Sequence, residues 1–457
     1  MTGKRLTFKD KRSLRDEAIV DFSRQSINRR EFMFKMTAAG VGAVMATKIA
    51  DTLAAPASTP SLNRWAKQAD ATIRFVKGPH APDDVAFWDD MKASFEGANP
   101  GITLQPEFFN WATMDAELTA AYASDSPWDV VYLVDLVLAK FVEAGQVADI
   151  TAQTTDASFE ENRAGIAPFT WDVTRFDDQT YGVGTLGAVF NIFYNVDMLE
   201  GAGITEFPQS RQALVDAAIV LTTDSVFGFE FRDAAPDFAW WDWFPYIHND
   251  GADVMTPDLT AQALDPLGAA GTQYLADMRT VHQVTPETGA YDREGKAALF
   301  AAGRVAILHD ESWRAPVWES QDLGFAFEVA MAPPSDDGTQ TAMGNFGYAT
   351  ISEQSPNKEA AWEFINWWSS ADVINDYAAR VGLQTVRTDS VPPYASPALS
   401  KIQTDLVPAV QPPQIHVNYS EMLQALWPEV ERAYRGEQTG AEAMANAGAA
   451  VEALIGE

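Results

Sequence analysis

The chain has 457 residues, 47% of them hydrophobic, and a formal net charge of −32. Its length and hydrophobic content predict two or more lobes and a large core. The acidic balance argues against nucleic acid as a partner, because binding to phosphate groups needs a basic face. The sequence contains no cysteine, which excludes disulfides, thiolate metal sites, iron–sulfur clusters and cysteine nucleophiles.

The first 57 residues differ in charge from the rest of the chain. They hold 11 of the 32 Lys and Arg residues but 6 of the 64 Asp and Glu residues, so residues 58–457 have a net charge of −37. Arg29-Arg30 precede a weakly apolar run over residues 36–47, and Ala55-Pro56-Ala57 offers the small residues that a signal peptidase reads. This order resembles a twin-arginine export signal. We predict that residues 1–57 are a signal peptide and that the mature protein works in the periplasm.

Strands alternate with helices along the first part of the mature chain. The expected strands cover residues 71–76, 102–109 and 128–135, and the helices after them cover residues 81–98, 113–123 and 136–145. The helix over 81–98 should end at Asn99-Pro100-Gly101, which disfavours further helical turns. Strand–helix alternation of this kind predicts an α/β fold with largely parallel sheets.

The second part of the chain repeats this pattern less regularly. Residues 188–195 and 304–310 are expected to form strands, and helices are expected over residues 210–222, 355–370, 422–435 and 441–455. Ser210 is a suitable N-cap for the first of these helices, because its hydroxyl can accept a free backbone N–H of the first turn.

One motif imitates a nucleotide site. "GVGTLG", with Gly182, Gly184 and Gly187, satisfies the G-x-G-x-x-G pattern. A dinucleotide site needs this pattern after a strand and at the start of a helix, so that the helix N-terminus meets the pyrophosphate. Here the glycines precede the strand over 188–195, so we predict no nucleotide cofactor.

The stretch "WWDWFPYIHNDG" at residues 240–251 is rich in aromatic residues. On a helix, Trp240, Trp243 and two later apolar residues share one face and should belong to the core. Trp241 lies about 100° around the helix, next to Asp242. An indole beside a carboxylate suits a sugar, whose C–H face stacks on the ring while its hydroxyls donate to the acid. We therefore predict that Trp241 faces a ligand and that Trp243 is buried.

Several segments carry a family resemblance. "YNVDMLEGAGITEFPQSRQALVDAAIVLT", "AALFAAGRVAILHDESWRAP", "GNFGYATISEQSPNKEAAWEFINWW" and "DVVYLVD…AGQVADIT" resemble segments of the extracellular solute-binding proteins of carbohydrate ABC transporters. This family includes maltose-binding protein. The matching segments keep the order and spacing of the family from about Ala71 to the C-terminus.

The resemblance implies a two-lobe periplasmic-binding-protein fold of type II, with a ligand cleft between α/β lobes and hinged crossing segments. The first lobe would comprise residues 71–186 plus 346–385, and the second residues 187–345 plus 386–457. The strand after Gly184 would be the first crossing.

The resemblance also implies a set of ligand-binding residues. Trp241 and Trp313 match stacking aromatic residues of the second lobe, and Asp242 lies beside the first of them. His80, Trp111 and Asp135 lie in strand-to-helix loops of the first lobe, where open α/β sheets usually bind ligands. Asn345 lies in the recrossing segment, which completes this set of seven.

The sequence also departs from the family pattern. Gly184 replaces the usual proline of one segment, and Leu133 stands where maltose-binding protein has an aromatic residue. The resemblance therefore does not imply maltose as the ligand.

By resemblance, the protein is a monomeric periplasmic receptor that delivers a sugar, oligosaccharide or polyol to the membrane permease subunits of an ABC importer. It would need no cofactor or metal and would catalyse no reaction. A secreted glycosidase or lyase is the alternative, supported by the acidic and aromatic content, although no motif positions a nucleophile or general acid. An exported redox protein is a third reading, opposed by the lack of cysteine and of a cofactor motif. The sequence leaves open whether the ligand is phosphorylated.

Overall fold

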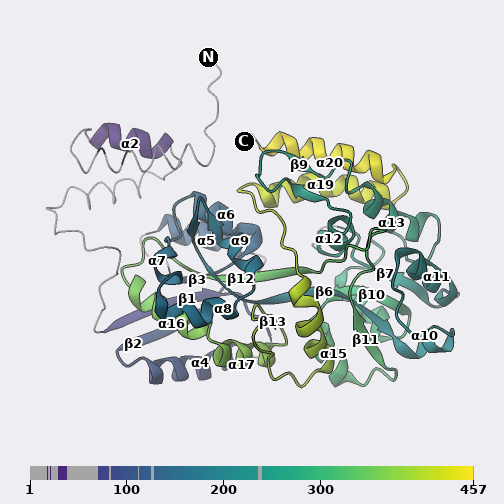
Figure 1. Cartoon of the computed structure of the whole chain (residues 1–457), viewed down its shortest axis with the longest axis horizontal. Coiled ribbons are helices and arrows are strands. Elements are labelled where there is room, and N and C mark those ends of the chain that lie inside the picture. Colours follow the sequence, from purple (N-terminus) through teal and green to yellow (C-terminus); the bar gives the residue numbers. More distant parts are fainter. Residues whose placement is uncertain are drawn as a thin grey trace, which may run out of the picture.

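The computed structural model describes most of the chain after residue 69 (Figure 1). The described residues are 18, 21, 29–38, 70–81, 84–111, 113–124, 128–234 and 239–455. Helix α2 (Arg29–Ala38) begins at the arginine pair, whereas the predicted cleavage site lies outside the described residues. Within the described ranges, every helix is too short or too polar to cross a bilayer.

The first lobe is built on three parallel strands in the order β2-β1-β3. The strands are β1 (Ala71–Lys77), β2 (Ile102–Phe108) and β3 (Val130–Val134), and the helices after them are α4 (Asp84–Ala98), α5 (Met114–Ala123) and α6 (Asp135–Glu143). The six elements expected from the sequence are therefore confirmed, with ends that differ by a few residues.

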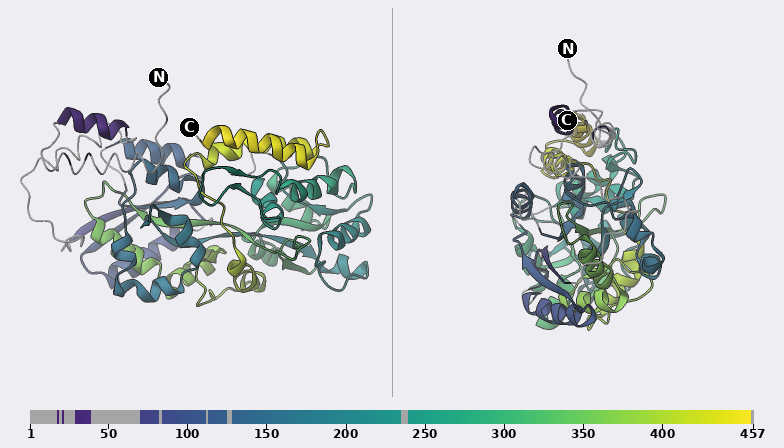
Figure 2. Two further views of the ribbon diagram at one scale, coloured as in Figure 1. Left: turned by 45° about the horizontal axis from the view of Figure 1, so that its top comes forward. Right: turned by 90° about the vertical axis from the view of Figure 1, so that its left-hand side faces the viewer.

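The second lobe contains β7 (Phe227–Glu230), β10 (Val305–Glu311) and β11 (Phe327–Ala330). Its helices are α10 (Val196–Gly201), α11 (Arg211–Leu221), α12 (Trp240–His248), α13 (Ala269–Thr280), α14 (Arg293–Ala301), α15 (Arg314–Gln321), α19 (Tyr419–Tyr434) and α20 (Gly440–Ile455). The predicted cap of α11 is confirmed, because the Ser210 hydroxyl accepts the backbone N–H of Ala213 at 3.2 Å. Figure 2 shows α19 and α20 side by side along one edge of the molecule.

Smaller elements complete the described fold. They are α7 (Thr151–Thr154), α8 (Glu160–Gly165), α9 (Pro168–Thr174), β4 (Arg175–Phe176), β5 (Gln179–Thr180), β8 (Asp253–Met255), β9 (Gln262–Ala263), α16 (Lys358–Trp368), α17 (Ala371–Val381), β13 (Gln384–Thr385) and α18 (Pro397–Lys401). Of these, α16 packs against β1 and β12, and α17 packs against α4 and β6, so both cover the first half of the sheet.

Two long strands join the lobes into one mixed sheet (Figure 1). Strand β6 (Val183–Asn195) and strand β12 (Met343–Ile351) pair antiparallel, and the order is β2-β1-β3-β12-β6-β10-β7, with β11 and β13 also paired to β6. The expectation of largely parallel sheets holds inside each lobe, where β1 is parallel to β2 and β3, and β7 to β10. It is wrong at the crossing, because strands that run back and forth between the lobes must be antiparallel.

The glycines of the "GVGTLG" motif serve this crossing. A Cβ atom at Gly187 would lie 2.1 Å from the carbonyl oxygen of Asn345 and 2.6 Å from the Cα of Phe346. Since β6 and β12 approach so closely here, any side chain at this position would push them apart. The lobe boundaries proposed from the sequence stay a prediction.

Candidate functional site

The carboxyl ends of the strands of both lobes face one another over the middle of the crossing strands. Strand β3 runs inward, since Val130 pairs with Ile351 and Val134 with Gly347. Strand β10 runs inward from the other side, ending at Glu311. Open α/β sheets bind ligands at the carboxyl ends of their strands. The two ligand-binding edges therefore flank one space, which we call the cleft.

The register of the strands gives the width of the cleft at its floor. Glu311 pairs with Phe190, and Phe190 pairs with Met343, whereas the end of β3 lies opposite Gly347. The two edges are therefore four residue steps apart along β12, which is about 13 Å at about 3.3 Å per residue. A span of this size suits a small ligand that touches both lobes.

Trp111 and His80 lie together on the first lobe's side of the cleft. Trp111 follows β2, is 38% exposed, and donates its Nε1–H to the carbonyl oxygen of Pro79 at 2.7 Å. The His80 ring stacks on it with centroids 5.6 Å apart. Burial and the nearby Lys77 lower the pKa of His80 well below its usual value, so the ring is neutral at pH 7. The pair offers an indole that is partly open to solvent.

A buried polar network supports the loop that carries His80. Lys77 and Asp84, both fully buried, form a salt bridge. Asp84 also accepts the backbone N–H of His80 at 2.7 Å and the hydroxyl of Tyr377 at 2.6 Å. Because the network ties the end of β1 to α4 and α17, it holds the loop in one position.

Asp135 begins α6 at the end of β3 and is 1% exposed. Its Oδ1 accepts the backbone N–H of Leu136 at 3.1 Å, and the backbone of Phe346 in β12 also bonds to it. Burial raises the pKa of Asp135 to about 7, although these backbone bonds oppose the rise. No lysine or arginine among the described residues lies within 4.0 Å of this carboxylate. Asp135 is thus a buried acid at the floor of the cleft.

Trp241 packs against the crossing strands in this structure, and its contact with a ligand stays a prediction. Trp241 is 2% exposed and stacks on Phe190 of β6, with centroids 5.5 Å apart and an interplanar angle of 11°. Trp243 is fully buried, as predicted. Every residue of α12 is buried, because β12, α13 and α19 surround this helix on its several sides. A helical wheel cannot distinguish a cleft face from a second packed face.

Asp242 binds an arginine in this structure, and its contact with a ligand stays a prediction. It is fully buried and binds Arg232, accepting the backbone N–H at 2.7 Å, the Nε–H at 3.1 Å and the Nη2–H at 2.7 Å. Arg232 donates in addition to Glu311 at 2.8 Å and lies over the Phe190 ring, 4.9 Å from its centroid. The carboxylate therefore holds Arg232 in place against the crossing strands.

Trp313 is the half-buried indole on the second lobe's side of the cleft. Its Nε1–H donates to Glu311 Oε2 at 2.6 Å, and the guanidinium of Arg314 lies 4.1 Å from the ring centroid. Asp310 and Glu294 in turn bind Arg314, at 3.1 and 2.8 Å. The guanidinium of Arg293 also lies over the ring, 5.8 Å from its centroid. The ring is thus fixed by its edge and flanked by two guanidinium groups, and it remains only half-buried.

Several buried polar atoms on or near the crossing strands have no hydrogen-bond partner among the described residues, and two of them concern the cleft. They are the side-chain oxygen of Asn345, on β12, and the hydroxyl of Tyr419, at the start of α19. Burial raises the pKa of the Tyr419 phenol, and the charges of Asp253 and of the nearby Asp135 add to this rise. Since buried polar atoms are usually satisfied, these are candidates for ligand contacts.

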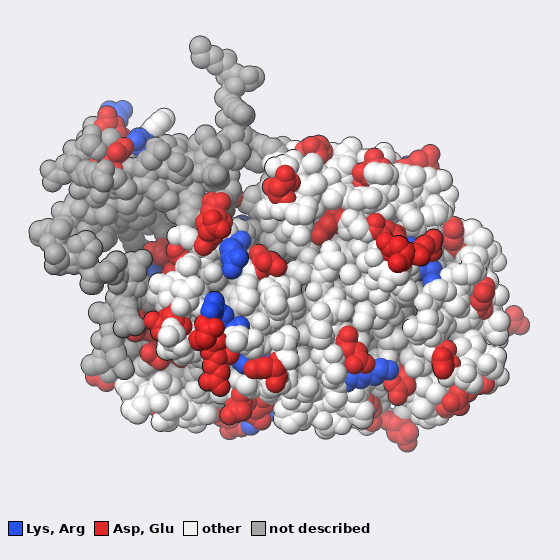
Figure 3. Space-filling model, in the orientation of Figure 1, with Lys and Arg blue, Asp and Glu red and all other residues white. Residues whose placement is uncertain are grey.

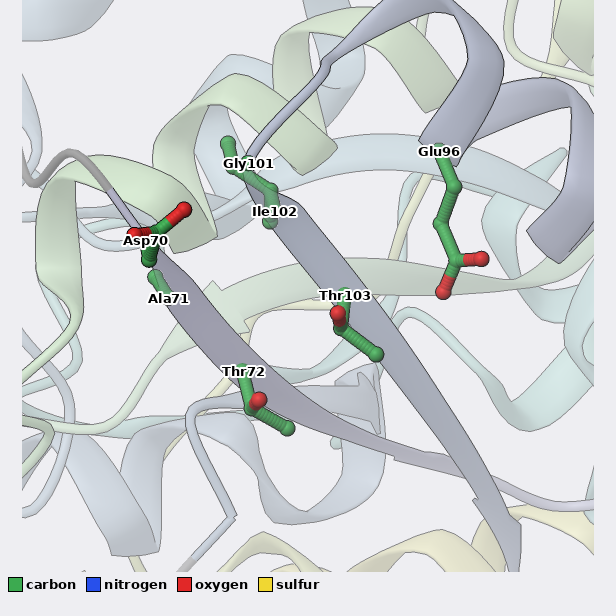
Figure 4. Close-up of a pocket in the computed structure, with 7 residues that line it drawn as sticks. All are labelled: Asp70, Ala71, Thr72, Glu96, Gly101, Ile102 and Thr103. Atoms are coloured by element: carbon green, nitrogen blue, oxygen red, sulfur yellow. The ribbon is translucent and has the colours of Figure 1, made fainter.

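A hollow of about 370 Å³ lies elsewhere, at the outer ends of β1 and β2 (Figure 4). It is lined by Asp70, Ala71, Thr72, Glu96, Gly101, Ile102 and Thr103. Glu96 already accepts the backbone N–H of Leu104 at 2.9 Å. Because it lies at the amino ends of the strands, away from the cleft, we assign it no function. Among the described residues, no group of three or more His, Asp or Glu is placed to hold a metal ion.

Sequence reasoning missed several residues that shape the site. Lys77, a charge at the end of a buried strand, was visible in "RFVKGPH", and Glu311 stands two residues before Trp313. Arg232 carried no local signal, since its partners come from α12 and β10. Tyr377 and Tyr419 reach the site only through the folding of distant helices.

Comparison with known proteins defines the class. Residues 90–404 match the family of bacterial extracellular solute-binding proteins, and the chain belongs to this family. Relatives from Brucella abortus and Brucella suis, named as candidate binding proteins, are 22% identical over 321 residues, covering 68% of this chain and 75% of theirs.

Solved structures share the fold. The sugar-binding protein MalE of Xanthomonas citri has a TM-score of 0.75 at 18% identity, covering 84% of this chain and 97% of that one. A solute-binding protein of Thermotoga lettingae bound to α-D-tagatose gives 0.70 at 20%, covering 84% and 100%. The cyclic α-maltosyl-1,6-maltose binding protein of Arthrobacter globiformis gives 0.73 at 19%, covering 85% and 99%. The protein therefore has the two-lobe α/β fold of solute-binding proteins.

Proposed function

We propose that the protein is the periplasmic binding component of an ABC importer. It closes two lobes on a sugar, oligosaccharide or polyol and delivers this ligand to membrane permease subunits. The observation that carries the proposal is the facing pair of strand edges, about 13 Å apart along β12 at about 3.3 Å per residue. A ligand between them contacts both lobes only when they are closed, so it favours the closed form.

The side chains at the cleft support a carbohydrate-like ligand. Trp111 and Trp313 each offer an indole of which part is uncovered, one on each lobe. Ring faces stack on the C–H surface of a sugar, and neighbouring acceptors bind its hydroxyls. Asp135, Asn345 and Tyr419 supply such polar groups near the floor. The sugar ligands of the structural relatives favour the same class, and those relatives are binding proteins rather than enzymes.

A thermal-shift screen against a panel of sugars, oligosaccharides and polyols tests the function. A ligand at about 100 times its Kd should add about 2.7 kcal/mol to the free energy of unfolding. Incubation of each hit with the protein, followed by analysis of the sugar, should recover it unchanged, whereas a product would favour the enzyme alternative. A panel without any stabilising member would contradict the proposal.

Variants at the two indoles test the placement of the ligand. Trp111→Ala and Trp313→Ala should each weaken binding at least several-fold in calorimetric titration, because each removes a stacking face. Trp367→Ala is the matched control, since this half-buried indole packs on Phe95 behind the first lobe's sheet. It should change stability and leave affinity unaltered. Unchanged affinity in both cleft variants would place the ligand elsewhere.

A further inference from the structure

In the described part of residues 70–455, most lysine and arginine side chains are paired with acids. Each one between residues 70 and 455, apart from Arg175 and Arg304, lies within 4.0 Å of a carboxylate oxygen in the described part of the chain. On the face drawn in Figure 3, acidic side chains border the basic ones and also occur alone. The cations are therefore already neutralised.

The two exceptions lie at the wrong ends of the strands to serve the cleft. Arg304 directly precedes Val305, the first residue of β10, whereas the cleft is at the last. Arg175 lies in β4, ahead of Val183, which pairs with Ala349 near the outer end of β12. Within residues 70–455, the segments outside the described part, 82–83, 112, 125–127 and 235–238, contain no Lys, Arg or His.

The cations at the cleft also have carboxylate partners. Arg232 is shared by Asp242 and Glu311, at 2.7 and 2.8 Å, and Lys77 is paired with Asp84. Arg293, which lies over Trp313, is within 3.2 Å of Glu294 and 3.5 Å of Glu311. Asp135 is the exception among the acids, because it is buried at the cleft floor with backbone N–H groups as partners and no cation within 4.0 Å in the described residues. An anionic ligand would therefore meet a like charge, and the cations near it already have carboxylate partners.

We propose that the cleft selects its ligands by charge, with Asp135 as the specificity-determining residue. An uncharged, hydroxyl-rich ligand donates its hydroxyls to the Asp135 carboxylate and binds, whereas the same ligand with a carboxylate or phosphate group is rejected. Repulsion between like charges is strong here, because the closed lobes exclude water and lower the effective dielectric constant. The inference rests on the proposed function and narrows its ligand class.

Matched pairs of neutral and anionic sugars test the inference. Calorimetric titration at pH 8 compares glucose with glucuronate, galactose with galacturonate, and maltotriose with its terminally oxidised acid. The wild-type protein should bind the neutral member of any binding pair at least tenfold more tightly. The ratio of the neutral to the anionic affinity should fall when the salt concentration rises from about 0.01 M to about 1 M, because the screening length falls from about 30 Å to about 3 Å. A ratio insensitive to salt would indicate steric exclusion and overturn the charge argument.

Two variants locate the effect. Asp135→Asn should reduce the preference for the neutral over the anionic sugar at least threefold, whatever its effect on the affinity for the neutral sugar alone. Glu328→Gln is the control, because it removes one exposed acid from β11. Glu328 forms an ion pair with Lys401 and lies away from the cleft edge. This control variant should leave the ratio unchanged. An anion that binds the wild type as tightly as its neutral parent overturns this inference and leaves the proposed function standing. Absence of binding by every neutral sugar overturns both.

Discussion

The replacement Asp135→Asn should stabilise the protein in a manner that depends on pH. Burial raises the pKa of Asp135 from 3.8 to about 7. Between these values the folded state holds a proton that the unfolded state has released, so the free energy of unfolding falls as the pH rises. A shift of about 3 units corresponds to about 4 kcal/mol at and above pH 7. Asparagine does not titrate, and so it avoids this cost.

Denaturant unfolding of the wild type and the variant between pH 4 and pH 8 measures the effect. The difference in free energy of unfolding should grow by up to about 4 kcal/mol from pH 4 to pH 8. At about 2.1 cal/mol/K per residue, this corresponds to about 4 °C in Tm for a chain of this length. The asparagine oxygen can still accept the N–H of Leu136, so the helix start should stay intact.

Asp84→Asn is the matched control for a buried acid with a cation beside it. This variant leaves the fully buried Lys77 without its carboxylate, and it should lower stability by about 3–5 kcal/mol. The difference in free energy of unfolding between Asp135→Asn and the wild type could also stay constant from pH 4 to pH 8. That result would show that burial does not raise the pKa of Asp135, and it would refute the reasoning.

Further predictions concern packing, closure and export. Trp241→Ala and Trp243→Ala should each lower the free energy of unfolding by about 3–5 kcal/mol, because both indoles are buried. An unchanged melting temperature for Trp241→Ala would indicate that this ring contacts the ligand and does not stabilise the core. Small-angle scattering should show a smaller radius of gyration when the protein is saturated with a ligand from the screen, and an equal radius would argue against lobe closure. Lys-Lys in place of Arg29-Arg30 should leave the precursor in the cytoplasm, and a normal periplasmic yield would refute the twin-arginine assignment.

Much of the first lobe could be predicted from local sequence. The strands over 71–76 and 102–109 are short β-rich runs, and "NPG" at 99–101 ends the helix between them, so local signals and tertiary structure agree. The rejection of the nucleotide motif also depended on local order alone, since the motif leads into a strand and not a helix; Gly184 and Gly187 lie inside β6 itself. The structure then supplied the reason for Gly187, which lies where β6 meets the backbone of β12.

The sequence by itself determined the family, the α/β class and the loops in which His80, Trp111, Asp135 and Trp313 lie, because these depend on periodicity and chain order. The tertiary structure alone decided which side chains are available. Trp241 is covered by Phe190, and Asp242 is bound by Arg232, through contacts between residues far apart in the chain. Periodicity gives the direction of a side chain from its own helix but not what packs there. Burial and charge pairing at the cleft are therefore properties of the assembled sheet.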